Sequence, residues 1–235
     1  MQRWVRIANV AVPLALLAAF AAQEGPRWLA RHPEHNPWAP LTLDQRNGWA
    51  TAGKLAALRT DPAACRAVFE ASGVVPTALP PVGSGACRRA DRMVLEAPGL
   101  ALRPVRPDAT CAVNVALLRW LRHEVQPTAR SLLGSEVAGL DHFGTYSCRP
   151  IRGNDSGRWS EHATGNAIDI SAFRLRDGRQ ISVLRDWPRE GREAEFLRRV
   201  RDGACTSFGT VLSPDYNQAH ADHLHLDQAE WRVCR

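Results

Sequence analysis

The stretch SEHATGNAIDIS, residues 160–171, places a histidine and an aspartate seven positions apart, with mostly small residues between them. Positions seven apart share one face of a helix, but Gly165 and Asn166 are poor helix formers, so a helix through this segment is disfavoured. Small residues instead let the backbone approach another group closely. The segment therefore suggests His162 and Asp169 as metal ligands at the start of a strand.

A second group of histidines lies near the C-terminus, in HADHLHLD at residues 220–227. Alternate residues of a strand point to the same face, so His223 and His225 are expected on one face and the intervening leucines in the core. Imidazole and carboxylate are usual ligands of zinc in catalytic sites, which keep one position open for water. His162, Asp169 and one of the paired histidines therefore form a candidate metal site.

The remaining patterns predict one α+β domain over residues 61–235. A helix is expected over 61–75, because DPAAC offers Asp61 as the N-cap and a proline at the first helical position. The apolar periodicity of 108–125 predicts a second helix, and that of 192–204 predicts a third that stops at Gly203. Strands are expected near 136–149 and on both sides of Asp177-Gly178, which is a hairpin signal.

The N-terminus has the layout of an export signal. Arg3 and Arg6 precede the apolar run IANVAVPLALLAAFAA at 7–22, which is shorter than the ~20 residues that span a bilayer comfortably. Residues 1–22 are therefore expected to be a signal peptide or an N-terminal membrane anchor, and the proline-rich 23–60 a linker or extended arm. The protein is accordingly expected in the periplasm or cell envelope, with membrane association through its N-terminus.

The charge and the cysteines fit an exported protein. The net charge of +6 suits an anionic wall polymer, whereas the dispersed arginines lack an aromatic-interleaved basic stripe, so nucleic acid is not an expected partner. Six cysteines in an exported chain suggest three disulfides, and the absence of C-x-x-C disfavours a thiolate zinc site. We expect sequence neighbours to pair: Cys65–Cys87, Cys111–Cys148 and Cys205–Cys234.

Several motifs resemble the bacterial extensin-like C-terminal domain family, namely YSCR, SEHATGNAIDIS, CTSFGTVLSPDYN and HADHLHLD, while NPWAPL resembles its start. The chain has no Ser-Pro-Pro repeats of plant extensins, so no structural wall role follows. More widely, S-x-H-x-x-G-x-A-x-D followed by H-x-H is similar to the D-Ala-D-Ala carboxypeptidases and lysostaphin-type zinc peptidases. That likeness implies a small antiparallel sheet that carries a zinc cleft and is flanked by helices.

The same resemblance implies roles for single residues. His162, Asp169 and His225 would bind Zn²⁺, with Gly165 and Ala167 keeping the backbone slim beside the metal.

The proton carrier is left open between two residues. Asp222 occupies the position used in the carboxypeptidase branch, three residues before the last zinc histidine, and His223 the position used in the lysostaphin branch. Arg149 matches the arginine that steadies a developing oxyanion in such enzymes. Asp227 and Glu161 are expected to support the site from outside or to lie at the surface.

These expectations describe an exported, monomeric, zinc-dependent peptidase-like protein that hydrolyses peptide bonds in peptidoglycan stem peptides or cross-links. The alternative is a wall-binding module without catalysis that retains the metal site. The presence of a candidate proton carrier favours the enzyme, because a pure binder does not need one.

Overall fold

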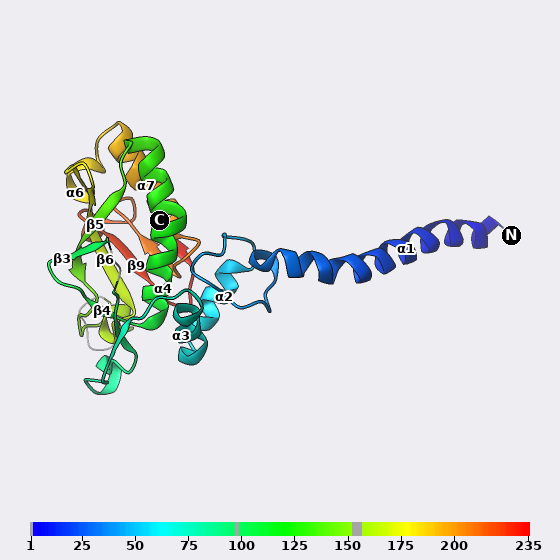
Figure 1. Cartoon of the computed structure of the whole chain (residues 1–235), viewed down its shortest axis with the longest axis horizontal. Helices are drawn as coiled ribbons and strands as arrows, with labels where there is room; N and C mark the ends of the chain where they lie inside the picture. The colour runs from blue at the N-terminus through cyan, green and yellow to red at the C-terminus, as the bar shows by residue number, and fades with distance from the viewer. Residues whose placement is uncertain (1, 97–98, 152–156) are drawn as a thin grey trace.

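A mixed seven-stranded sheet lies at the centre of the computed structural model, which describes residues 2–96, 99–151 and 157–235 (Figure 1). The strand order is β10-β8-β9-β6-β5-β3, and β7 pairs with β6 beyond the end of β9. The strands are β3 (Ala101–Arg103), β5 (Val137–Gly144), β6 (Ala167–Leu175), β7 (Gln180–Ser182), β8 (Thr210–Leu212), β9 (Leu224–Asp227) and β10 (Val233–Cys234).

The expected antiparallel sheet is correct for the central strands and wrong at both edges. The pairs β5–β6, β6–β7, β6–β9 and β8–β9 are antiparallel, whereas β3–β5 and β10–β8 are parallel. Parallel neighbours need a crossover connection, and the long helical segment between β3 and β5 supplies one. A separate three-stranded antiparallel sheet contains β1 (Thr77–Leu79), β2 (Arg92–Val94) and β4 (Asp108–Ala109).

The predicted hairpin is confirmed, since β6 and β7 flank the turn at Asp177-Gly178. The strand that we expected to reach Arg149 ends earlier, at Gly144, so Arg149 lies in the loop that follows. The alternation predicted for the last strand holds for its core face, because Leu224 and Leu226 are fully buried.

The helices pack mainly against one face of the central sheet (Figure 1). Trp120 fixes this packing: its ring lies edge-on to Phe173 of β6, and its Nε1 donates to the Val200 carbonyl 2.7 Å away. The helices are α2 (Thr51–Leu58), α3 (Pro62–Ala71), α4 (Cys111–Trp120), α5 (Gln126–Thr128), α6 (Val183–Asp186) and α7 (Arg192–Ala204). Wider turns η3 (Leu121–Val125) and η4 (Ala129–Leu133) continue α4 and α5, and short 3-10 helices are η1 (Pro33–His35), η2 (Gly85–Cys87), η5 (Glu161–Thr164) and η6 (Gln218–His220).

The predicted helix start at Asp61 is confirmed, because its carboxylate accepts hydrogen bonds from the backbone N–H groups of Ala63 and Ala64. Helix α7 runs one residue past Gly203, so that glycine does not end it. A glycine is needed there for another reason: a Cβ would lie 2.8 Å from the Glu124 side chain.

The N-terminal helix α1 (Gln2–Arg31) extends away from the rest of the molecule (Figure 1). Within the described residues, no helix combines the length and apolarity required to cross a membrane. The expected extended arm at 23–60 is helical at both ends, since α1 continues to Arg31 and α2 begins at Thr51. Leu41 and Leu43 between them are buried in the core cluster, because the segment packs against α4 rather than lying loose on the surface.

Arg119 of α4 fastens this segment to the domain. Its fully buried guanidinium donates to the main-chain oxygens of Thr42 and Gln45 and to the side-chain oxygen of Asn47. Burial, with the nearby charge of Arg122, lowers the Arg119 pKa to about 10, so the side chain stays charged at neutral pH. Backbone carbonyls therefore offset the cost of burying this cation.

Three disulfides join the six cysteines, but only the last expected pairing, Cys205–Cys234, is correct. The pairings Cys65–Cys87 and Cys111–Cys148 are wrong, because tertiary packing rather than sequence distance decides the partner. Helix α3 lies against α4, which brings Cys65 to Cys111, the first residue of α4. Contact between η2 and η5 brings Cys87 of η2 to Cys148 in the loop after β5. The observed pairs are Cys65–Cys111, Cys87–Cys148 and Cys205–Cys234.

Candidate metal centre

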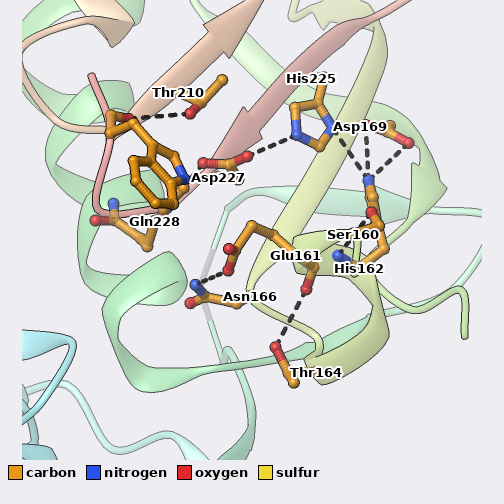
Figure 2. Close-up of polar contacts among 12 residues, drawn as sticks. Ser160, Glu161, His162, Thr164, Asn166, Asp169, Thr210, His225, Asp227 and Gln228 are labelled. Atoms are coloured by element: carbon orange, nitrogen blue, oxygen red, sulfur yellow. Dashed lines mark hydrogen bonds and ion pairs between the residues drawn. The ribbon is translucent and has the colours of Figure 1, made fainter. Parts of the chain in front are cut away.

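Three side chains from three elements converge on one point beside β6 (Figure 2). Asp169 of β6 and His225 of β9 are direct partners in the antiparallel pairing, and His162 reaches them from η5. The carboxylate Oδ1 of Asp169 lies 2.9 Å from His225 Nδ1, and its Oδ2 lies 3.1 Å from His162 Nε2. One potential ligand atom from each residue lies within 4.8 Å of the others, so the structure brings all three predicted ligands together.

The turn before β6 fixes the position of His162. The hydroxyl of Ser160 accepts from the His162 backbone N–H, and Gly165 ends the turn with a φ of 74°. This left-handed conformation favours glycine, since a side chain is strained there. A Cβ at Gly165 would meet the Arg89 guanidinium at 3.0 Å, so the small residue makes room for Arg89.

Arg89 is a buried residue that no motif in the sequence marks. It forms a 2.7 Å ion pair with Asp108 and stacks over the ring of Tyr146, with 4.7 Å from the guanidinium carbon to the ring centroid. The backbone N–H of Thr110, two residues after Asp108, donates to the Gly165 carbonyl at 3.0 Å. A lone arginine in a loop carries no sequence signal for this contact.

Asp169 and His225 stabilise each other as ions. Burial opposes ionisation of Asp169, but hydrogen bonds and charge from His162 and His225 outweigh it and hold the carboxyl pKa well below its usual range. Burial likewise opposes protonation of His225, yet hydrogen bonds to Asp169 and Asp227 raise its pKa to about 9. The metal-free cluster is therefore a centre of concentrated, mutually compensating charge.

Asp227 holds His225 from the side opposite Asp169 (Figure 2). Its Oδ2 lies 2.9 Å from His225 Nε2, while its Oδ1 accepts from the Ala229 backbone N–H at 2.8 Å. When His225 ligates a metal as a neutral imidazole through Nδ1, the nitrogen that faces Asp169, its proton lies on Nε2 and is donated to the Asp227 carboxylate. Asp227 is therefore a buried residue that contacts the cluster from outside, and it does not lie at the surface.

Glu161 lies on the same side of the site, also outside the cluster (Figure 2). Its Oε2 accepts from Asn166 Nδ2 at 2.6 Å. Burial, reinforced by the nearby charge of Asp227, raises the Glu161 pKa. Its side chain therefore ties Asn166 to the turn and stabilises the backbone that carries His162.

The two candidate proton carriers are in contact with each other. His223 Nδ1 lies 2.8 Å from Asp222 Oδ1, and His223 Nε2 lies 3.6 Å from Asp169 Oδ1. Strand β9 begins at Leu224, so His223 precedes the strand instead of sharing its face with His225 as expected. Even so, His223 is the member of the pair that faces the cluster, and Asp222 lies behind it.

His220 and Arg149 lie at the periphery. The His220 ring centroid is 5.9 Å from that of His225, and its Nδ1 lies 2.7 Å from Asn217 Oδ1. Burial, together with the positive charges of His223, His225 and Arg149, lowers the His220 pKa to about 4. Arg149 is exposed and contributes to this effect, and within the described part of the chain its side chain has no hydrogen bond or ion pair with the three candidate ligands.

The donor set is suited to a divalent metal. His162 Nε2 and His225 Nδ1 approach to 3.1 Å while both face the same carboxylate, an arrangement in which one shared cation satisfies all three groups. Two imidazole nitrogens and one carboxylate oxygen match the ligands that zinc takes in catalytic sites, and three protein ligands leave a fourth position free.

These features define an α+β protein in which two central antiparallel strands and the turn η5 carry a His–Asp–His cluster fit for a divalent cation. The chain belongs to the family described as Extensin-like protein C-terminus, whose sequence model matches residues 63–235. Searches among curated proteins and among solved structures found no match.

Proposed function

We propose that this protein is an exported, monomeric, zinc-dependent peptidase that hydrolyses peptide bonds in peptidoglycan stem peptides or cross-links. The observation that carries the proposal is the convergence of His162, Asp169 and His225 with the Asp222–His223 pair directly beside them. The motif likeness to D-Ala-D-Ala carboxypeptidases and lysostaphin-type peptidases supports the choice of substrate, and the export-like N-terminus supports the compartment.

His162, Asp169 and His225 would hold the zinc. Bound zinc supplies a Lewis acid that activates water and polarises an amide carbonyl. Asp227 keeps His225 in the tautomer that presents Nδ1 to the cluster.

We assign the role of general base to His223. The Asp222 carboxylate only accepts, so neutral His223 donates from Nδ1 and retains Nε2 as a base on the side of the cluster. Asp222 then orients this imidazole and stabilises it once it is protonated. Arg149, exposed beside His220, is proposed to steady the oxyanion of the scissile amide.

The test combines metal analysis with digestion of purified sacculi. The full chain prepared without chelator should contain about one equivalent of zinc and release stem-peptide fragments. His162→Ala should lose both, whereas His32→Ala, which removes an imidazole remote from the cluster, should lose neither.

Two further variants separate the proton carrier from its support. With zinc retained, His223→Ala should lower turnover by ~10²–10⁴-fold, as expected for loss of a general base. Asp222→Asn should cost on the order of 10–100-fold, as for a lost orienting group. A zinc-containing protein that binds sacculi but releases nothing would replace the peptidase by the wall-binding module, and stoichiometric zinc in His162→Ala would refute the ligand set.

A further inference from the structure

Four aromatic rings follow one another along one side of the candidate metal centre, each tilted or edge-on to the next. Phe143 lies 5.6 Å from His223, His223 lies 5.2 Å from His220, and His220 lies 5.6 Å from Tyr216, all between ring centroids. The two histidines in the middle adjoin the cluster, since His223 Nε2 is 3.6 Å from Asp169 Oδ1. The row therefore runs from the end of β5 to the loop after β8, past the candidate metal ligands.

Both ends of the row are exposed although they are large apolar rings. Phe143 is 61% exposed and Tyr216 is 48% exposed. Single exposed apolar residues are common, but here two flank the same group of functional side chains. Their contacts with the imidazoles hold the rings in place while much of each surface remains open to a ligand.

The strand geometry places the Phe143 ring on this side. His142 pairs with Ile170 and Gly144 pairs with Asp169, so Phe143 is the extra residue of a β-bulge. Bulges redirect a side chain and are frequent beside active sites. The preceding His142 is buried, with Nε2 2.8 Å from the Val105 carbonyl, so the bulge separates a core side chain from one that faces the row.

Polar groups lie beside the rings. Asn217 contacts His220 through its side-chain oxygen, which leaves its amide N–H₂ group to donate elsewhere. Arg149 is exposed, and its positive charge acts on His220. An aromatic surface with an amide donor beside it and a guanidinium charge in the vicinity suits a ligand that has an apolar face and a polar rim.

We propose that Phe143, His223, His220 and Tyr216 form a platform for an N-acetylated pyranose ring of the wall glycan. This inference rests on the proposed peptidoglycan substrate and adds recognition of the sugar to it. A pyranose presents C–H groups on its face, which the negative face of an aromatic ring attracts, and hydroxyl and acetamido groups at its edge. Stem peptides offer mostly small or charged side chains, which do not match two exposed large rings.

The test uses two probes that separate sugar from peptide. The full chain is titrated by calorimetry with a β-1,4-linked N-acetylglucosamine tetramer, which contains no peptide bond, and with a synthetic sugar-free stem pentapeptide. Phe143→Ala and Tyr216→Ala should each weaken binding of the tetramer by about tenfold and leave pentapeptide binding unchanged. Tyr216→Phe, which keeps the ring, should retain the affinity for the tetramer.

Trp38→Ala is the matched control, because Trp38 is 82% exposed but belongs to the N-terminal segment. Zinc content should equal that of the wild type in every variant, since none of these residues is a proposed ligand. Failure of the wild type to bind the tetramer, unchanged affinity in both alanine variants, or an equal loss with the pentapeptide would overturn the sugar platform. Because binding of the tetramer needs no hydrolysis, a wild type without peptidase activity would refute the proposed function and leave this test intact.

Discussion

Replacing Asp227 by asparagine probes how the candidate metal centre is supported from outside. Asp227 is 5% exposed and uses both carboxylate oxygens, one towards His225 Nε2 and one towards the Ala229 backbone N–H. Asparagine keeps the shape but has only one side-chain oxygen, so its amide N–H₂ group must face one of these two N–H donors. The substitution therefore breaks a contact without opening a cavity.

The expected loss of zinc affinity depends on which of the two contacts is lost. If the asparagine oxygen stays with Ala229, the amide donates towards His225 and drives the proton from Nε2 to Nδ1, the atom that faces Asp169. Loss of such an outer carboxylate typically costs ~10–100-fold in metal affinity, or about 1.4–2.7 kcal/mol. Because Asp227 is buried and no other side chain contacts His225 Nε2 in the described structure, we expect the upper part of this range.

The assay is competitive zinc titration of the full chain against a chromophoric chelator at pH 7.5. Asp222→Asn is the matched control: it makes the same chemical change on a carboxylate that contacts His223 and no proposed ligand. We expect its zinc affinity to stay within about twofold of the wild type. The reasoning fails if Asp227→Asn binds zinc as tightly as the wild type, or if both variants lose affinity equally.

Two further predictions concern stability. The pKa of His225 is raised from 6.5 to about 9 in the metal-free fold. The stabilisation that protonated His225 contributes is therefore fully present below pH 6.5 and is lost as the pH rises through 9. The Tm of EDTA-treated protein should fall across this window, and it should fall less steeply in His225→Gln. Gly165→Ala should destabilise the protein by about 2 kcal/mol or more in denaturant unfolding, since φ is 74° and Arg89 must move, whereas Gly178→Ala, with φ of 89° but open space, should cost only about 1–2 kcal/mol. Equal losses in the two glycine variants would show that the contact with Arg89 contributes nothing.

Local patterns in the sequence predicted those elements whose cause is local. The N-cap at Asp61, the turn at Asp177-Gly178 and the alternation around Leu224 each depend on a few neighbouring residues, and each appears in the fold. Local patterns also marked His162, Asp169 and the paired histidines as candidate ligands, whereas the choice of His225 came from the resemblance to zinc peptidases.

Features that depend on packing between distant segments could not be predicted in this way. The edge strands are parallel to their neighbours because crossover connections join them. Leu41 is buried because Arg119 binds the main chain beside it, at Thr42. The start of β9 after His223 changed the geometry expected for the Asp222–His223 pair. A one-residue bulge at Phe143 likewise leaves no trace in a hydrophobic pattern, because it depends on the register with β6.

The disulfide connectivity has a consequence for how the chain matures. Cys87 lies inside the loop closed by Cys65 and Cys111, while its own partner Cys148 lies outside it, so the two covalent loops interlace along the sequence. Under the proposed export with the N-terminus first, Cys65 and Cys87 meet the oxidising compartment before either native partner does. A rapid oxidant would trap them together, and thiolate exchange would then have to release the wrong bond. The yield of native protein should accordingly depend on a catalyst of disulfide reshuffling more than on the strength of the oxidant.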